Sequence, residues 1–320
     1  MLRWNELIPE DVGKKLTALD VEGIKWKNNL NALIEGIEKE WDISLEGVIE
    51  GGSEAFVVRC TLINGKKCIL KIFIPQLEGN SVFVQQVEAY KVANGYGYGY
   101  AKLIKYDIEK KAMLLECLGL SMCELTYSPE EQIEIICSLL KETWITVDEN
   151  YSLKPMKELI QWFREFIMDT WEKTGKPCDR KVIDRAMLYL ESRIISVNSY
   201  EAVLVHGDPH PGNILQTLND DSASFKFIDP DGIIGEPGYD LGVLMREWID
   251  EFEDFPIEKA KERISLLYKE TGIDIQSIWE WGFIQLVSTG LFLKLIEGTG
   301  LGDRMLTISS AWLSIQNMKQ

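Results

Sequence analysis

The segment 202–215 constrains the fold most, because a polar loop rich in glycine and proline lies between two short apolar runs. Both histidines of the 320-residue chain, His206 and His210, lie in this loop. The run 225–228 predicts a further short strand that ends at Asp229. We therefore expect a strand–loop–strand unit whose polar side chains gather at the strand ends.

Three side chains of this unit have the chemistry that phosphoryl transfer from a nucleotide requires. We expect Asp208 to accept or orient the proton of an attacking hydroxyl. Asn213 and Asp229 would supply hard oxygen ligands to Mg²⁺ ions that bridge the nucleotide phosphates. The residues thus predict a small-molecule kinase that uses ATP, or GTP, together with magnesium.

The order and spacing of three short motifs resemble those of a known family. The motifs are HGDPHPGN at 206–213, IDPDG at 228–232 and GEPGYDL at 235–241. They resemble the aminoglycoside phosphotransferase family, which is choline-kinase-like, and within it the streptomycin and hydroxyurea resistance kinases. The resemblance implies an α+β, two-lobed protein-kinase-like fold, with a small antiparallel sheet in the N-terminal lobe and a mainly helical C-terminal lobe.

The same resemblance implies a role for each matching residue. Asp208 would act as the catalytic base, and Asn213 and Asp229 would bind the metal. Asp240 would support the catalytic loop from behind. His206 would pack beneath the loop and fix its backbone, and we expect no chemistry from it.

The upstream half has features expected of a nucleotide-binding lobe. Residues 46–59 predict a strand, a glycine-rich turn and a second strand, and Asn64-Gly65 predicts a hairpin between two β-rich runs. Gly51, Gly52 and Ser53 at the first turn would let backbone N–H groups approach phosphates. A plain hairpin turn explains these three residues equally well.

Lys71 lies inside an apolar strand, where a charge is costly unless it is paired or bound to a ligand. Glu88 follows in a predicted amphipathic helix. A lysine and a glutamate placed in this way hold the α- and β-phosphates in kinases. Glu54 and Glu78 are alternative partners for Lys71, and a surface ion pair is the simpler alternative for the whole arrangement.

The apolar run 112–119 ends in a glycine at the point where the two lobes should join. In similar proteins the backbone of such a segment binds the adenine edge. Glu116 and Leu118 would then contribute a carbonyl and an amide. An ordinary edge strand is the alternative.

Acidic residues are concentrated just after the metal motif, where Arg246 is the one basic residue between 240 and 254. Carboxylates beside an aromatic face would bind the ammonium groups and apolar ring faces of an aminocyclitol. The candidates for acceptor binding are Asp231, Glu247, Trp248, Asp250 and Glu251. A helix with a solvated acidic face is the alternative.

We predict an N-terminal helical extension at 1–40, a nucleotide-binding lobe at 41–118 and a helical lobe with the catalytic loop and acceptor site at 119–320. The extension should consist of short helices broken by Pro9 and Gly23. Apolar spacing typical of helices recurs at 129–147, 155–196 and 256–318.

Charge and cysteine content limit the partners. A net charge of −17 argues against nucleic acid and suits a cationic or polyhydroxyl small-molecule acceptor, although it would also serve solubility. No apolar stretch is long enough to span a membrane, and the chain opens without a signal-like core. The six cysteines form no metal-like spacing, so we expect free thiols in a reducing cytoplasm. We also expect a monomer or homodimer.

Two other functions fit the same residues. The acceptor could be another alcohol, because choline, homoserine, methylthioribose and ketosamine kinases have similar loops. The chain could also be a non-catalytic binding protein with a kinase fold, although retention of Lys71, Asp208, Asn213 and Asp229 argues against this. A protein kinase is disfavoured, because His206-Gly207-Asp208 lacks the arginine that binds an activation-loop phosphate.

Overall fold

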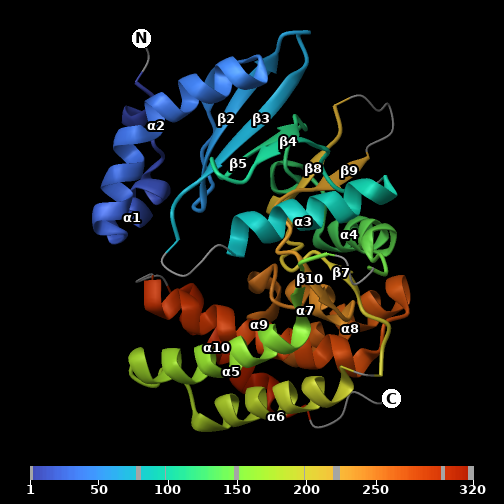
Figure 1. Ribbon diagram of the computed structural model, residues 1–320. Helices are drawn as coiled ribbons and strands as arrows, with labels where there is room; N and C mark the ends of the chain where they lie inside the picture. The colour runs from blue at the N-terminus through green and yellow to red at the C-terminus, as the bar shows by residue number, and fades with distance from the viewer. Residues whose placement is uncertain are drawn as a thin grey trace. The chain divides into compact units, whose positions relative to one another are not determined.

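The computed structural model describes residues 3–76, 81–97, 99–147, 151–197, 199–218, 224–296 and 300–315. The chain divides into two compact units (Figure 1). The first unit comprises 1–119 and 217–224, and the second comprises 120–216 and 225–320. The small sheet lies in the first unit, and most helices lie in the second.

Five antiparallel strands form the sheet of the first unit, in the order β1-β2-β3-β5-β4. The strands are β1 (Ile43–Val48), β2 (Ala55–Leu62), β3 (Lys67–Phe73), β4 (Leu103–Asp107) and β5 (Ala112–Glu116). The hairpin expected at Asn64-Gly65 is confirmed, since this pair lies in the turn between β2 and β3. Gly65 has φ +83°, a conformation that glycine adopts without strain.

Helices of the first unit precede this sheet in the sequence and also lie between β3 and β4. They are η1 (Trp4–Glu6), α1 (Glu10–Ala18), α2 (Asp20–Trp41) and α3 (Ser81–Tyr96). The expected break at Gly23 is wrong, because α2 continues through it and the chain instead turns at Asp20, which has φ +47°. Gly23 serves close packing: a Cβ there would lie 1.9 Å from the Leu16 carbonyl oxygen of α1.

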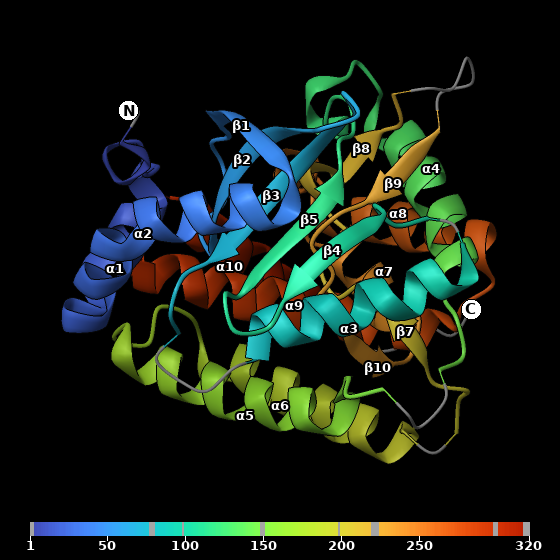
Figure 2. The ribbon, with the colours of Figure 1, turned by 45° about the horizontal axis from the view of Figure 1, so that its top comes forward.

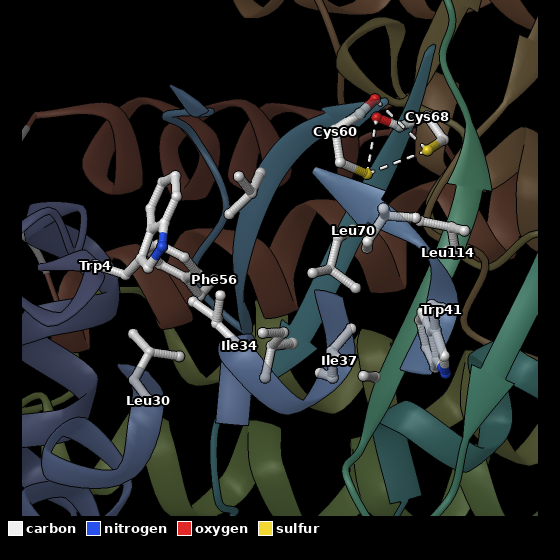
Figure 3. Packing of buried hydrophobic residues seen from close by; sticks show 14 residues of the cluster. Trp4, Leu30, Ile34, Ile37, Trp41, Phe56, Cys60, Cys68, Leu70 and Leu114 are labelled. Atoms are coloured by element: carbon white, nitrogen blue, oxygen red, sulfur yellow. Dashed lines mark hydrogen bonds between the residues drawn. The ribbon is translucent and has the colours of Figure 1, made fainter. Parts of the chain in front are cut away.

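The core of the first unit lies between α2 and the sheet (Figures 2 and 3). Leu30, Ile34 and Ile37 recur on one face of α2 and are fully buried with Phe56 and Leu70 of the strands. Each such side chain contributes roughly 1.5–3 kcal/mol when it leaves water. This burial fixes the sheet on the long helix.

Ten helices, counted over the described residues, make up most of the second unit (Figure 1). They are η2 (Met122–Glu124), α4 (Pro129–Thr143), α5 (Met156–Lys173), α6 (Arg180–Ser196), η3 (Pro211–Asn213), α7 (Gly238–Leu244), η4 (Ile249–Phe252), α8 (Pro256–Thr271), α9 (Ile275–Ile296) and α10 (Leu301–Trp312). α9 is buried over most of its length and packs against α5, α6, α7 and α10. The helix is accordingly apolar nearly all round, as a central helix must be.

Short strands carry the loops of the second unit (Figure 2). They are β6 (Lys154–Pro155), β7 (Val203–Val205), β8 (Ile214–Gln216), β9 (Phe225–Phe227) and β10 (Ile233–Gly235). β6, β10 and β7 form one sheet, and β8 pairs antiparallel with β9. No helix in the described part of the chain has both the length and the apolar composition that crossing a membrane would take.

Candidate active site

The loop after β7 is held from below by the carboxylate of Asp240 in α7. One oxygen of Asp240 accepts a hydrogen bond from the Gly207 N–H at 2.8 Å. The other accepts from the His206 N–H and from the Trp144 indole N–H, both at 3.0 Å. Burial raises the pKa of Asp240 to about 6, although the three donors favour the charged form. Trp144 is a member of this arrangement that the sequence did not indicate.

α7 is in turn anchored through Glu236, which lies just before the helix. Glu236 accepts hydrogen bonds from the Ser277 hydroxyl and the Trp281 indole, both at 2.7 Å. It also pairs with Arg193 of α6 at 3.1 Å, and Arg193 pairs with Glu280 at 2.6 Å. All of these side chains are buried, so the position of Asp240 is fixed by the central helix α9.

His206 connects the loop to the segment that carries Asp229. Its Nδ1 accepts a hydrogen bond from the Asp208 N–H at 3.1 Å, so Nε2 carries the proton and donates it to the Ile228 carbonyl at 2.8 Å. The ring is fully buried, and burial lowers its pKa to about 4. Both nitrogens are therefore used in holding backbone, with the imidazole neutral.

This neutral histidine predicts a pH dependence of stability. The unfolded chain binds a proton at His206 below pH 6.5 and the folded chain does so only below about pH 4. The contribution is thus complete above pH 6.5 and is lost as the pH falls towards 4. Between pH 7 and 4 the stability advantage of the wild type over His206→Gln should shrink by about 3 kcal/mol. Urea denaturation of both proteins tests this, and an advantage independent of pH would contradict it.

Asn213 and Asp229 lie at the same end of the β8–β9 ribbon. Asn213 immediately precedes β8, and its carbonyl accepts a hydrogen bond from the Ile228 N–H at 2.9 Å. The Asn213 side-chain NH₂ donates to the Asp208 carbonyl at 3.0 Å, which orients the amide oxygen. Asp229 has φ +58°, a conformation that strains a residue with a side chain and is frequent at functional sites.

The donor set at this end of the ribbon suits Mg²⁺. It offers an amide oxygen from Asn213 and a half-buried carboxylate from Asp229, both hard oxygen ligands. The described residues contain no group of three or more histidine, cysteine, aspartate or glutamate side chains placed to hold a metal. Mg²⁺ commonly binds only one or two protein side chains, because substrate phosphates and waters complete its coordination shell.

The Asp208 carboxylate is contacted by two basic side chains. One oxygen forms an ion pair with Arg246, and the other lies 3.6 Å from His210 Nε2. His210 Nδ1 accepts a hydrogen bond from the Gly212 N–H at 3.1 Å, so Nε2–H faces Asp208. The carboxyl side chain remains 37% exposed, which leaves it accessible to a ligand.

Arg246 is a part of the site that the sequence did not indicate. Its Nη1 donates to Gln285 Oε1 at 2.7 Å and to Thr289 Oγ1 at 2.9 Å, both on α9. Glu247 Oε1 lies 3.5 Å from Arg246 Nε. Arg246 stood out in the sequence as the single base among acids, yet its contact with Asp208 spans 38 positions and has no local signal.

The residues expected to bind the acceptor are distributed over two places. Asp231 lies against the loop that follows β7, since a Cβ at Gly207 would come within 2.5 Å of it, and Glu247 lies beside Arg246. Three others contact arginines of α8 and α10. Asp250 forms an ion pair with Arg304, and Glu251 forms one with Arg263. The Arg263 guanidinium carbon lies 5.2 Å from the centre of the Trp248 ring.

In the first unit, Lys71 is buried in the middle of β3. It is 7% exposed, and its ammonium lies 5.3 Å from the centre of the Phe73 ring. Glu88 on α3 pairs with Lys91 at 2.7 Å, and Glu54 pairs with Lys15 of α1. Glu78 lies outside the described residues, and the pairing of Lys71 with Glu88 stays a prediction.

The other nucleotide candidates lie at strand ends of the same unit. Gly51, Gly52 and Ser53 connect β1 to β2, and Gly51 has φ +100°. Glu116 is the last residue of β5, and its N–H donates to the Lys102 carbonyl at 2.9 Å. Leu118 follows in an irregular, half-buried segment.

The fold and loop are those of protein-kinase-like phosphotransferases for small molecules. The aminoglycoside/hydroxyurea antibiotic resistance kinase family model matches residues 40–292, and the chain belongs to this family. It is therefore a small-molecule phosphotransferase that acts on a hydroxyl group. This membership confirms the resemblance drawn from the three motifs.

Similar proteins agree with this assignment. Streptomycin 6-kinase of Streptomyces glaucescens is 23% identical over 289 residues, which cover 89% of this chain and 90% of the relative. The fold is similar to choline kinase LicA from Streptococcus pneumoniae, with a TM-score of 0.63, 16% identity and coverage of 90% and 99% of the two chains. It is also similar to aminoglycoside phosphotransferase APH(3'')-Id from Streptomyces rimosus, with a TM-score of 0.56, 15% identity and coverage of 81% and 98%. The expected α+β kinase-like fold is thus confirmed.

Proposed function

We propose that the chain transfers the γ-phosphoryl group of ATP, or of GTP, to a hydroxyl of an aminoglycoside-like acceptor in a magnesium-dependent reaction. The observation that carries the proposal is the Asp208 carboxylate. It is half-buried, yet accessible, at the head of a loop whose backbone is fixed by Asp240 and His206. A carboxylate held in this way can orient an attacking hydroxyl without reorganisation.

In this mechanism Asp208 accepts a hydrogen bond from the acceptor hydroxyl and directs its oxygen towards the γ-phosphorus. Arg246 fixes one carboxylate oxygen, so the other is presented to the hydroxyl. Asn213 and Asp229 would hold Mg²⁺, which when bound neutralises charge on the phosphates. His210 borders the same carboxylate and limits where the hydroxyl can approach.

For the nucleotide we propose residues 41–118, which lie within the first unit. Lys71 would neutralise phosphate charge, with Glu88 as its expected partner. Gly51, Gly52 and Ser53 would offer backbone N–H groups to phosphates, and Glu116 and Leu118 would bind the adenine edge through their backbone. The buried position of the Lys71 ammonium supports this, because an ammonium there binds an anion more strongly than one in water.

For the acceptor we propose a cationic, polyhydroxylated molecule. The chain's net charge of −17 favours cations, and relatives of this chain are streptomycin kinases. Asp231 and Glu247 would face its cationic groups near Asp208. We place the reaction in the cytoplasm, where six free cysteines are stable.

The test is release of ADP or GDP with each acceptor of a panel: streptomycin, other aminoglycosides, hydroxyurea, choline, homoserine and methylthioribose. We expect release that needs Mg²⁺ and is stimulated by an aminoglycoside. Stimulation by choline or homoserine alone would reassign the acceptor. Nucleotide binding with no stimulated release from any acceptor would contradict the proposed function.

Arg246 gives a prediction for this reaction. Arg246→Ala should lower kcat by about 10–100-fold, because Asp208 loses the contact that orients its carboxylate. The nucleotide KM should stay within about twofold, since Arg246 contacts none of the candidate nucleotide ligands among the described residues. Steady-state kinetics beside the control Arg180→Ala, an exposed arginine of α6, measures this. Wild-type kcat in Arg246→Ala would refute the positioning role.

A further inference from the structure

Three aromatic side chains of the second unit form a cluster that is half-buried at Phe166 and exposed at its two other members. Trp162 and Phe166 of α5 stack with their ring centres 4.8 Å apart and their planes 11° apart. The ring centre of Phe166 lies 6.4 Å from that of Phe292 of α9. Trp162 is 46% exposed and Phe292 is 45% exposed, so the cluster presents ring surface to solvent. Contiguous exposed apolar surface of this kind marks binding sites.

The cluster adjoins the candidate active site along α9. Gln285 and Thr289, which bind Arg246, lie on the same face of this helix as Phe292. At 100° per residue, Gln285 and Phe292 are separated by about 20° around the axis, and Thr289 and Phe292 by about 60°. Phe292 lies about 5 Å beyond Thr289 along the axis, and helical side chains lean towards the N-terminus, so its ring covers the Thr289 turn.

The path from the cluster to the reacting group is therefore short. Thr289 contacts Arg246 at 2.9 Å, and Arg246 pairs with Asp208. Phe163, which lies between Trp162 and Phe166 in the sequence, is buried and packs on Tyr239 of α7, with their ring centres 6.3 Å apart. α5 is thus fixed to the helix that carries Asp240, and its exposed aromatics keep their place relative to the loop.

Acidic side chains border the stacked rings. Asp169 and Glu165 are exposed on α5, one turn from Phe166 and Trp162 respectively. Asp169 lies within about 20° of Trp162 around the helix axis. Among the described residues no cationic side chain lies within 4 Å of the Asp169 carboxylate. This face of α5 therefore offers aromatic rings together with negative charge.

We propose that Trp162, Phe166 and Phe292 form a platform on which the ring of a cationic, polyhydroxylated acceptor stacks while one hydroxyl reaches Asp208. Aromatic faces bind the apolar C–H face of a saturated sugar or cyclitol ring and attract cations on it. Asp169 and Glu165 face the amino or guanidino groups. The inference rests on the proposed function and names the surface that determines its acceptor.

Streptomycin is the probe for the test, with three readouts: acceptor KM, kcat and equilibrium binding by calorimetry without nucleotide. Trp162→Ala and Phe292→Ala should each raise the streptomycin KM and dissociation constant about tenfold or more. kcat and the nucleotide KM should change by less than about threefold. Trp162→Phe, which keeps a ring, should recover most of the affinity. Phe255→Ala, an exposed aromatic before α8, is the matched control and should behave as the wild type.

The outcomes separate the platform from the reaction. A wild type that phosphorylates streptomycin, with unchanged streptomycin KM and affinity in Trp162→Ala and Phe292→Ala, overturns the platform and leaves the function standing. A wild type that phosphorylates no cationic acceptor overturns both. Circular dichroism and unchanged nucleotide affinity show that each variant is folded, which is expected because the substituted side chains are exposed.

Discussion

Asp208→Asn is expected to lower kcat by about 10²–10⁴-fold, the range typical of a lost general base or hydroxyl-orienting carboxylate. Asparagine has the same shape and can still accept a hydrogen bond from Arg246. It cannot take a proton, and it lacks the charge that attracts the acceptor hydroxyl. The loop geometry depends on Asp240 and His206, so the fold should persist.

Nucleotide affinity distinguishes a catalytic role of Asp208 from a structural one. Asp208→Asn should bind the magnesium nucleotide within about threefold of the wild type, because Asn213 and Asp229 are unchanged. Calorimetry for binding and single-turnover kinetics for transfer measure the two quantities. Asp254→Asn, an exposed acid ahead of α8, is the matched control. Wild-type turnover by Asp208→Asn would remove Asp208 from the catalytic role.

Asp240→Asn is expected to lower the free energy of unfolding by about 2–4 kcal/mol and kcat by about 100-fold. The carboxylate accepts from the N–H groups of His206 and Gly207 and from the Trp144 indole. In asparagine an NH₂ replaces one accepting oxygen and faces a buried donor, which leaves polar groups unsatisfied. The loop would then lose the support that orients Asp208.

Trp144→Phe should weaken the support of the loop less than Asp240→Asn does. It removes one of the three donors to Asp240 and leaves the carboxylate hydrogen-bonded to the backbone. It should cost about 1 kcal/mol and leave kcat within about threefold of the wild type. Chemical denaturation and steady-state kinetics test both variants. An Asp240→Asn protein with wild-type stability and kcat would show that the loop holds its shape by other contacts.

The conformation of the loop between β7 and β8 was predictable from sequence because its signals are local. The apolar runs before Gly207 and after Asn213 indicated strands, and the structure has β7 and β8 there. Asn64-Gly65 likewise indicated a hairpin through the backbone freedom of glycine. The motif order also indicated the family, which the family match confirms.

Long-range contacts were not predictable. Arg246 reaches Asp208 across 38 positions, and Trp144 reaches Asp240 across 96, and neither pairing has a periodic or local signature. The helix break predicted at Gly23 was wrong. The low helix propensity of glycine is outweighed there, because a small residue permits close packing on α1. The acidic run after Asp240 was equally ambiguous, since solvated pairs and ligand-binding carboxylates have the same composition.

Asp250 and Glu251 illustrate that ambiguity. Both were expected to bind the acceptor, and both form ion pairs with arginines of the second unit. The apolar spacing at 155–196 predicted helices, and in α5 Trp162 is 46% exposed while Phe163 beside it is buried. Helical spacing identified the apolar face of α5 but could not tell its buried centre from its exposed edge.

The most direct test of the proposed reaction is the mass of streptomycin after incubation with the protein, ATP and Mg²⁺, beside the same reaction with Asp208→Asn. We expect a product heavier by one phosphoryl group with the wild type and almost none with the variant. Unmodified streptomycin in both reactions, from wild-type protein that binds the nucleotide, would contradict the proposed acceptor. Equal amounts of product in both would contradict the role of Asp208.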